Sequence, residues 1–214
     1  RDGMKHSAYA DKSPAWYLFY SLLHPSDAFQ EMKYNRKFSG LQTVLIVLLW
    51  MLTELCAIEL TDFDLNAYVG QEKSLLRVAV ITALTFLIAV IANWCFCTLL
   101  DGKGRLLHIA SVGASALVPY IAVRICEILL SYITNSGAAT FFQYAVTVAV
   151  IWGFIIVFLG LQAVHEYSAG MTLLSLVLTV VGIVIIIFVG LIVVQLYQQI
   201  VVFISTIVLE LQYR

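Results

Sequence analysis

Apolar stretches recur along this chain, and each is long enough to cross a lipid bilayer as a helix. The hydrocarbon core of a bilayer is roughly 30 Å thick, so a crossing helix needs about 20 apolar residues. Five segments qualify, at residues 41–60, 75–100, 106–132, 140–164 and 171–209. The sequence therefore predicts an all-α fold, a polytopic transmembrane helical bundle with five spans.

The composition agrees with a lipid environment. Of the 214 residues, 62% are hydrophobic and 12% are charged, whereas soluble domains carry about 25% charged residues. A water-soluble core of this length could not bury so much apolar side chain. The net charge of −1 gives no electrostatic basis for binding nucleic acid. We expect the lipid bilayer, and no nucleic acid, as a partner.

The last apolar segment is unusually long. At 1.5 Å per residue, residues 171–209 would form a helix of about 58 Å, nearly twice the thickness of the hydrocarbon core. Two antiparallel spans would need a turn, yet the segment contains no Pro, Asn or Asp, and its weak points are Gly182, Gly190 and the glutamines at 195, 198 and 199. We expect one span over roughly residues 171–194 that continues as a projecting or packed helix. A sixth, short span is the alternative.

Basic residues outside the spans are distributed unequally. Eight would lie on one side of the membrane and three on the other, and the positive-inside rule places the richer side in the cytoplasm. The N-terminus is then cytoplasmic and, with five spans, the C-terminus lies outside. The richer side carries Arg1, Lys5, Lys12, Lys33, Arg36, Lys37, Lys103 and Arg105, and the other side carries Lys73, Arg77 and Arg214. We expect Lys33, Arg36, Lys37, Lys103 and Arg105 to contact lipid headgroups.

Residues 1–40 are expected to form a cytoplasmic segment before a five-span domain at residues 41–214. Ser13 followed by Pro14 is a favourable helix start, because serine caps the first turn and proline needs no amide partner there. His24 and Pro25 predict a break. The pattern indicates two short amphipathic helices on the cytoplasmic face of the bilayer, and a partly ordered cytosolic tail is the alternative.

The stretch between the second and third spans contains two cysteines and a glycine-bracketed lysine. Residues 101–105, Asp-Gly-Lys-Gly-Arg, are too short for a phosphate-binding loop and lie between helices, so they predict a tight cytoplasmic helix hairpin. Cys95 and Cys97 point away from each other on a helix and lack further ligands, so neither a metal site nor a cofactor is expected. Cys56 and Cys126 also lie within apolar runs, which is typical of unpaired buried thiols.

Three charged residues fall inside predicted spans and away from the span ends. Arg124 and Glu127 are three residues apart and share a helix face, one turn beyond Pro119, and Glu54 lies in the first span. Charges within a membrane are costly and usually pair or face a cavity. This cluster is either an ion pair that fixes helix packing or a polar site for handling protons or ions.

No pattern of catalytic residues is apparent in the sequence. Gly113-Ala-Ser115 could supply a serine nucleophile, but His165 lies at a span end, not deep in a second span. Small residues that let helices approach closely explain this stretch better. We therefore do not expect an enzyme.

Four spaced stretches resemble a known family. They are SLLHPSDAFQEMKYNRKFS at 21–39, ANWCFCTLLDGKGRLLHIASVGASALVPYIA at 92–122, GLQAVHEYSAGMTLLSLVLT at 160–179 and QQIVVFISTIVLELQYR at 198–214. Together they resemble the bacterial branch of the Yip domain family, five-span membrane proteins named for interaction with Ypt/Rab GTPases. The positions that match the family pattern are His24, Pro25, Asn93, Trp94, Leu100, Gly102, Gly104, Pro119, His165, Tyr167, Glu210 and Arg214.

The resemblance implies five spans, a cytoplasmic N-terminus and no catalytic activity. Eukaryotic members are trafficking adaptors, but their Asp-Leu-Tyr-Gly-Pro stretch is absent from this sequence, so Rab binding is not implied. The expected function is that of a scaffold or partner of other integral membrane proteins in a bacterial plasma membrane, with homo-oligomers also compatible. The alternative is a small transporter, channel or transporter accessory subunit that uses Glu54, Arg124 and Glu127.

Overall fold

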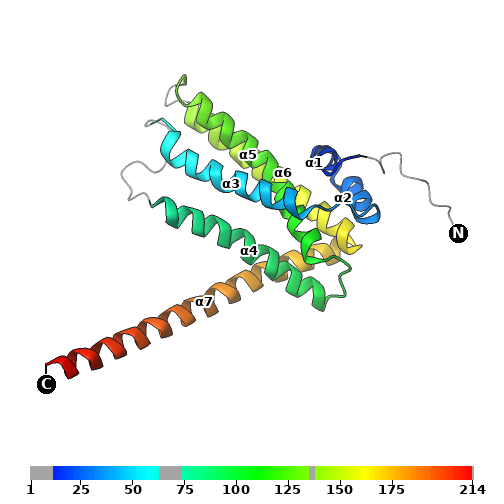
Figure 1. Cartoon of the computed structure of the whole chain (residues 1–214). Coiled ribbons are helices and arrows are strands. Elements are labelled where there is room, and N and C mark those ends of the chain that lie inside the picture. Colours follow the sequence, from blue (N-terminus) through cyan, green and yellow to red (C-terminus); the bar gives the residue numbers. More distant parts are fainter. Residues whose placement is uncertain (1–11, 63–73, 135–137, 214) are drawn as a thin grey trace.

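A computed structural model describes residues 12–62, 74–134 and 138–213 of the chain (Figure 1). Within these ranges every regular element is an α-helix, and there is no strand. The helices are α1 (Pro14–Leu23), α2 (Pro25–Tyr34), α3 (Gly40–Leu60), α4 (Leu75–Leu99), α5 (Leu106–Leu130), α6 (Ala139–His165) and α7 (Ala169–Gln212). Helices α3 to α7 are long and apolar enough to cross a membrane. The predicted all-α, five-span fold class is confirmed, and the protein is an integral membrane protein.

The two short helices begin and end at the residues that the sequence indicated. Ser13 caps α1, because its Oγ accepts a hydrogen bond from the amide of Trp16 at 3.4 Å and Pro14 occupies the first turn. The chain turns at His24, and α2 starts directly at Pro25. Proline at this position ends α1, because the residue before a proline is disfavoured in helical conformation.

Helices α1 and α2 dock against one end of the bundle (Figure 1). Tyr17 and Phe29 are completely buried and belong to the same hydrophobic cluster as Val112 of α5 and Ile156 of α6. The indole Nε1 of Trp152 in α6 donates a hydrogen bond to the carbonyl of Leu22 at 3.0 Å. The short helices are therefore part of the core of the molecule.

Successive spans run in opposite directions (Figure 1). Helix α5 packs against both α3 and α6, whereas α4 packs mainly against α7 (Figure 1). Helices α3, α5 and α6 thus form one group and α4 and α7 a second, and the C-terminal half of α7 extends away from both groups (Figure 1).

Helix α7 is continuous over 44 residues, a length of about 66 Å at 1.5 Å per residue. The alternative of a sixth span is therefore wrong. Gly182 does not break the helix, because it packs against α4: a Cβ at this position would lie 2.4 Å from the ring of Phe96. Beyond the bundle, every residue from 187 to 213 is exposed (Figure 1).

Candidate functional site

Polar side chains from distant parts of the chain meet at the end of the bundle where α1 and α2 dock. We name this cluster the polar corner and define it by Lys33 of α2, Gly102, Lys103 and Gly104 of the α4–α5 turn, and His165, Glu166 and Tyr167 at the α6–α7 turn. The predicted hairpin at residues 101–105 is one side of it.

Both turns of the polar corner begin with a left-handed residue that ends a helix. Asp101 follows α4 with φ 55°, and Glu166 follows α6 with φ 58°. The next amide in each case closes the helix end, since Gly102 N donates to Cys97 O at 2.8 Å and Tyr167 N donates to Gln162 O at 3.1 Å. This is the usual way in which the last carbonyls of a helix are satisfied.

His165 is the buried centre of the polar corner, with 1% of its surface exposed. Its Nδ1 accepts a hydrogen bond from the amide of Gly104 at 3.3 Å, so the neutral ring carries its proton on Nε2. The backbone approaches the ring too closely for a side chain. A Cβ at Gly102 would lie 2.3 Å from Nδ1, and a Cβ at Gly104 would lie 2.7 Å from Cε1. The contact with His165 therefore requires glycine at both positions.

Tyr167 connects the two turns. Its ring stacks on His165 with centroids 5.1 Å apart and planes at 19°. Its hydroxyl lies 3.1 Å from the carbonyl oxygens of both Cys97 and Leu100, which share its single proton. Burial raises the pKa of Tyr167 to about 12, so the hydroxyl remains a donor at neutral pH and satisfies the carbonyls at the end of α4.

Glu166 holds two lysines from other elements. Its Oε1 lies 2.8 Å from Lys33 Nζ, and its Oε2 pairs with Lys103 Nζ. Lys33 also donates to the carbonyl of Val164 at 2.7 Å. A positive charge at this position stabilises the C-terminus of α6, because it interacts favourably with the helix dipole. The hydrogen bonds from Lys103 and then from Lys33 lower the pKa of Glu166 to about 2. One carboxylate thus links α2, the α4–α5 turn and the α6–α7 turn.

The sequence placed five basic residues at the headgroup layer, and the structure groups them at this end of the bundle. Lys33 and Lys103 are both paired with Glu166. Arg36 and Lys37 follow α2, and Arg105 precedes α5, where its amide donates to His108 Nδ1 at 3.3 Å. Headgroup contact by these five residues stays a prediction.

The intramembrane charges form two groups. Arg124 Nη1 pairs with Glu127 Oε2 on one face of α5, as their spacing indicated. Glu54 Oε1 instead accepts hydrogen bonds from Tyr120 Oη at 2.6 Å and from Trp50 Nε1 at 3.2 Å. Arg124 Nε is buried without a hydrogen-bond partner among the described residues. Among the described residues, Arg124 therefore forms its ion pair with Glu127, and Glu54 takes part in no ion pair.

A second polar contact connects α4 with α7. Asn93 Nδ2 donates to Thr179 Oγ1 at 2.9 Å, and Cys97 Sγ lies 3.6 Å from Asn93 Oδ1. Cys97 is buried and Cys95 is exposed, and all four cysteines are free thiols. Over the part of the chain that the structure describes, no group of three His, Cys, Asp or Glu side chains is placed to hold a metal ion.

The other positions of the resemblance lie apart from the polar corner. His24 stacks on Tyr20 with centroids 5.0 Å apart, and Trp94 is 41% exposed on α4. Pro119 lies inside α5, and Glu210 is exposed near the end of α7. Arg214 lies outside the described residues. The sequence did not identify the role of Glu166, although its position directly after a predicted span was a signal of a helix cap.

The comparisons with known proteins address the whole chain. The Yip1 domain matches residues 19–192, from within α1 to within α7. Neither the search of curated proteins nor the search of solved structures returned a match. The matched region contains the whole polar corner, the Asn93–Thr179 contact and all of α2 to α6. Because the match covers well over half of its length, the chain belongs to the Yip1 domain family.

Proposed function

We propose that this Yip1-family membrane protein is a non-enzymatic scaffold that binds other integral membrane proteins. The observation that carries the proposal is the second half of α7. Residues 187–213 are all exposed, and most of them are apolar. The whole helix of 44 residues is about twice as long as the hydrocarbon core is thick, so one crossing does not cover it, and its free half is available to helices of other membrane proteins.

The polar residues of this half of α7 support the same proposal. Gln195, Gln198, Gln199 and Thr206 line one hollow on the helix surface together with Val202 and Phe203. Amide side chains next to lipid favour helix association, because they form hydrogen bonds across helices. An amide both donates and accepts, so the partner is a helix with amides or hydroxyls, and a second copy of this chain also meets that requirement.

We further propose that the protein lies in the bacterial plasma membrane with its N-terminus in the cytoplasm and its C-terminus outside. The unequal distribution of lysine and arginine supports this orientation. In the same proposal, residues 1–40 form the cytoplasmic segment and residues 41–214 the five-span domain. The amphipathic helices α1 and α2 would then lie at the cytoplasmic headgroup layer.

Affinity purification in mild detergent tests the scaffold proposal. The tagged full chain should recover the same membrane proteins repeatedly, and tagging a recovered protein should recover this chain. Replacing Gln195, Gln198 and Gln199 together by leucine should reduce recovery, because it removes the amides and keeps the helix apolar. A matched control replaces Gln143 of α6, near the other side of the bundle, by leucine. Repeated recovery of the chain alone would contradict the proposal.

A second candidate function is transport, and the intramembrane charges favour it. Arg124 Nε is buried and unpaired among the described residues, and it lies on the same helix as the Glu127 partner and Tyr120. Buried charges with unused hydrogen-bonding capacity are typical of ion or proton pathways. The flux of ions or protons into proteoliposomes tests this candidate. Arg124→Ala and Glu127→Gln should each reduce that flux. Absence of flux in the wild-type protein would reject transport.

A further inference from the structure

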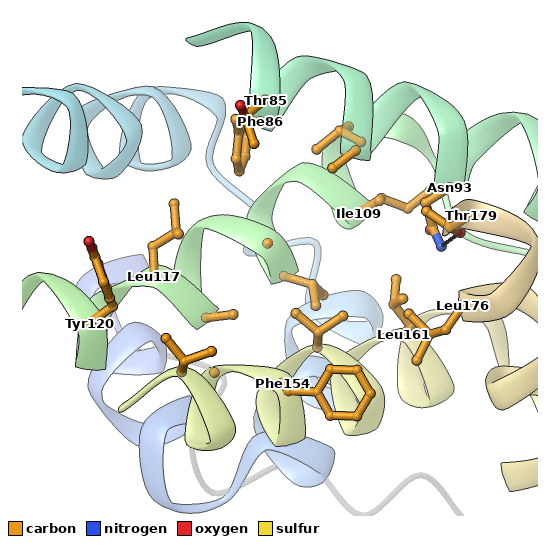
Figure 2. Close-up of a pocket in the computed structure, with 18 of the residues that line it drawn as sticks. Thr85, Phe86, Asn93, Ile109, Leu117, Tyr120, Phe154, Leu161, Leu176 and Thr179 are labelled. Carbon is orange, nitrogen blue, oxygen red and sulfur yellow. Dashed lines mark hydrogen bonds between the residues drawn. The ribbon is translucent and has the colours of Figure 1, made fainter. Parts of the chain in front are cut away.

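A cavity of about 510 Å³ lies between the two groups of spans. Its walls come from α4 and α7 on one side and from α5 and α6 on the other (Figure 2). Trp50 of α3 also lines the cavity. The volume lies within the range of about 300–1,000 Å³ found for small-molecule sites. Val150 and Phe154 line the cavity and are 54% and 56% exposed, so it opens on the lipid-facing surface of the bundle.

The cavity covers one half of the membrane. Along α5 its lining extends from Ile109 to Tyr120, a distance of about 16 Å at 1.5 Å per residue. Half of the hydrocarbon core is about 15 Å. Trp50 marks the middle of α3, and Ile109 lies one turn from the α4–α5 turn. The cavity therefore has the depth of a single leaflet, the one on the side of the polar corner.

The polar groups of the lining are all satisfied within the protein. At the inner end, next to the polar corner, Asn93 bonds with Thr179, and farther along α4 Thr85 Oγ1 donates to the carbonyl of Ile81 at 2.8 Å (Figure 2). At the other end Trp50 and Tyr120 donate to Glu54. The remaining lining is apolar, so the walls suit hydrocarbon and not a polar solute. Such a lining also disfavours water, which needs 2–4 polar partners.

The depth of the cavity disfavours a helix as the occupant. A helix that crosses the hydrocarbon core would lie along a groove of about 30 Å, whereas the lining extends over about 16 Å along α5. A single extended hydrocarbon chain is much thinner. It can enter sideways past Val150 and Phe154, while its headgroup stays outside, because the inner end is closed by the Asn93–Thr179 contact between α4 and α7.

We infer that the cavity between α4, α5, α6 and α7 binds one acyl chain of a membrane phospholipid from the leaflet next to the polar corner. The chain completes the contact between the two groups of helices, which otherwise meet mainly at their inner end. The lining residues Gly113, Leu117 and Leu176 are partly exposed, and the acyl chain covers the part of their surface that faces the cavity.

Photolabelling tests this inference with the full chain in vesicles of phosphatidylethanolamine and phosphatidylglycerol. The probe is a phosphatidylcholine with a diazirine in the middle of one acyl chain. We expect label on Leu117 and Leu176, which line the cavity and are partly exposed, as well as on the outward-facing Val148. Label on Val148 without label on Leu117 and Leu176 would overturn the inference. A free fatty acid with the same diazirine distinguishes the source, since stronger cavity labelling by the fatty acid than by the phospholipid would reject a phospholipid.

A substitution that fills the cavity with a larger side chain provides a second test. Val157 lines the cavity on α6, whereas Val148 is 66% exposed on the same helix. Val157→Phe should reduce labelling of Leu117 and Leu176 several-fold relative to Val148, because the ring occupies the space of the chain. The same substitution at the outer position, Val148→Phe, should leave their labelling unchanged. Unchanged labelling in Val157→Phe would also overturn the inference. If that variant aggregates, Ala89→Phe on the opposite wall fills the same space.

Discussion

His165 shows how one residue determines the sequence around it. The ring is buried against the α4–α5 turn, and its Nδ1 accepts the amide of Gly104. The backbone of that turn must therefore come within contact distance of the ring, which only glycine permits at positions 102 and 104. The sequence indicated a tight turn here, but it could not show that a histidine more than sixty residues away sets the need for glycine.

Substitution at the turn measures this contact. Gly102→Ala places a methyl group 2.3 Å from His165 Nδ1 and 2.6 Å from Tyr167 Oη, so part of the polar corner must shift. We expect a loss of about 1–3 kcal/mol in the free energy of unfolding. Thermal unfolding in detergent measures it. Gly170→Ala is the matched control, because its Cβ would meet nothing within 4 Å, and it should not destabilise the protein.

The carboxylate of Glu166 gives the protein an acid-sensitive contact. Its pKa is lowered from 4.5 to about 2 by the two lysines. A lowered pKa in the folded state means that the contribution to stability is complete above about pH 4.5 and is lost as the pH falls toward 2. Glu166→Gln should therefore lower the melting temperature at pH 7 but have progressively less effect below pH 4.5.

A melting series from pH 7 to pH 2.5 in detergent tests this difference between the wild-type protein and Glu166→Gln. The exposed residue Glu210, which has no ion pair among the described residues, supplies the control substitution Glu210→Gln. Its melting temperature should follow that of the wild type. A difference for Glu166→Gln that does not change with pH would show that the two lysines do not act on this carboxylate.

At the scale of helices, the ends of the spans were predictable and their neighbours were not. Apolar runs between polar residues placed α3 to α6 within two residues of their observed ends, because the lipid requirement acts on composition and length. The pairing of α4 with α7 depends on Asn93, Thr179 and the close approach of Gly182 to Phe96. Contacts of this kind join residues far apart in the sequence, so no local pattern indicates them.

The Asn93–Thr179 hydrogen bond can be weighed by a double-mutant cycle. Asn93→Leu and Thr179→Val each remove one partner, and the coupling between them should be about 0.6 kcal/mol, the average for hydrogen bonds between membrane helices. Reversible unfolding in mixed micelles measures the free energies. Thr98→Val is the control, because Thr98 Oγ1 donates only within α4, to the carbonyl of Trp94, and should show no coupling with Asn93→Leu. Zero coupling for the Asn93 and Thr179 pair would contradict an energetic role.

At the scale of the whole molecule, five crossings and the long α7 determine on which sides the turns lie. Composition and charge were sufficient to predict the number of spans. They could not predict that α1 and α2 complete the core of the bundle, because Tyr17 and Phe29 would also suit a bilayer surface. The polar corner likewise depends on three segments that meet only in the folded chain.

Single-cysteine labelling tests the arrangement of the spans. The variants Lys103→Cys and Tyr213→Cys should react with a membrane-impermeant maleimide from opposite sides of the membrane. The reason is that α5, α6 and α7 separate the two positions by three crossings. Sealed vesicles of both orientations provide the measurement, and the parent chain with its own four cysteines gives the background. Labelling of both positions from the same side would contradict five spans.

The contacts of Lys33 have a consequence for biosynthesis. Its two partners at the end of α6 lie 131 and 133 residues further along the chain. A ribosome makes α2 early, yet the groups that hold it emerge only after the fourth span has been translated. The first helices of the protein can therefore dock only after most of the bundle has been inserted. Their docking marks the stage at which α6 is complete.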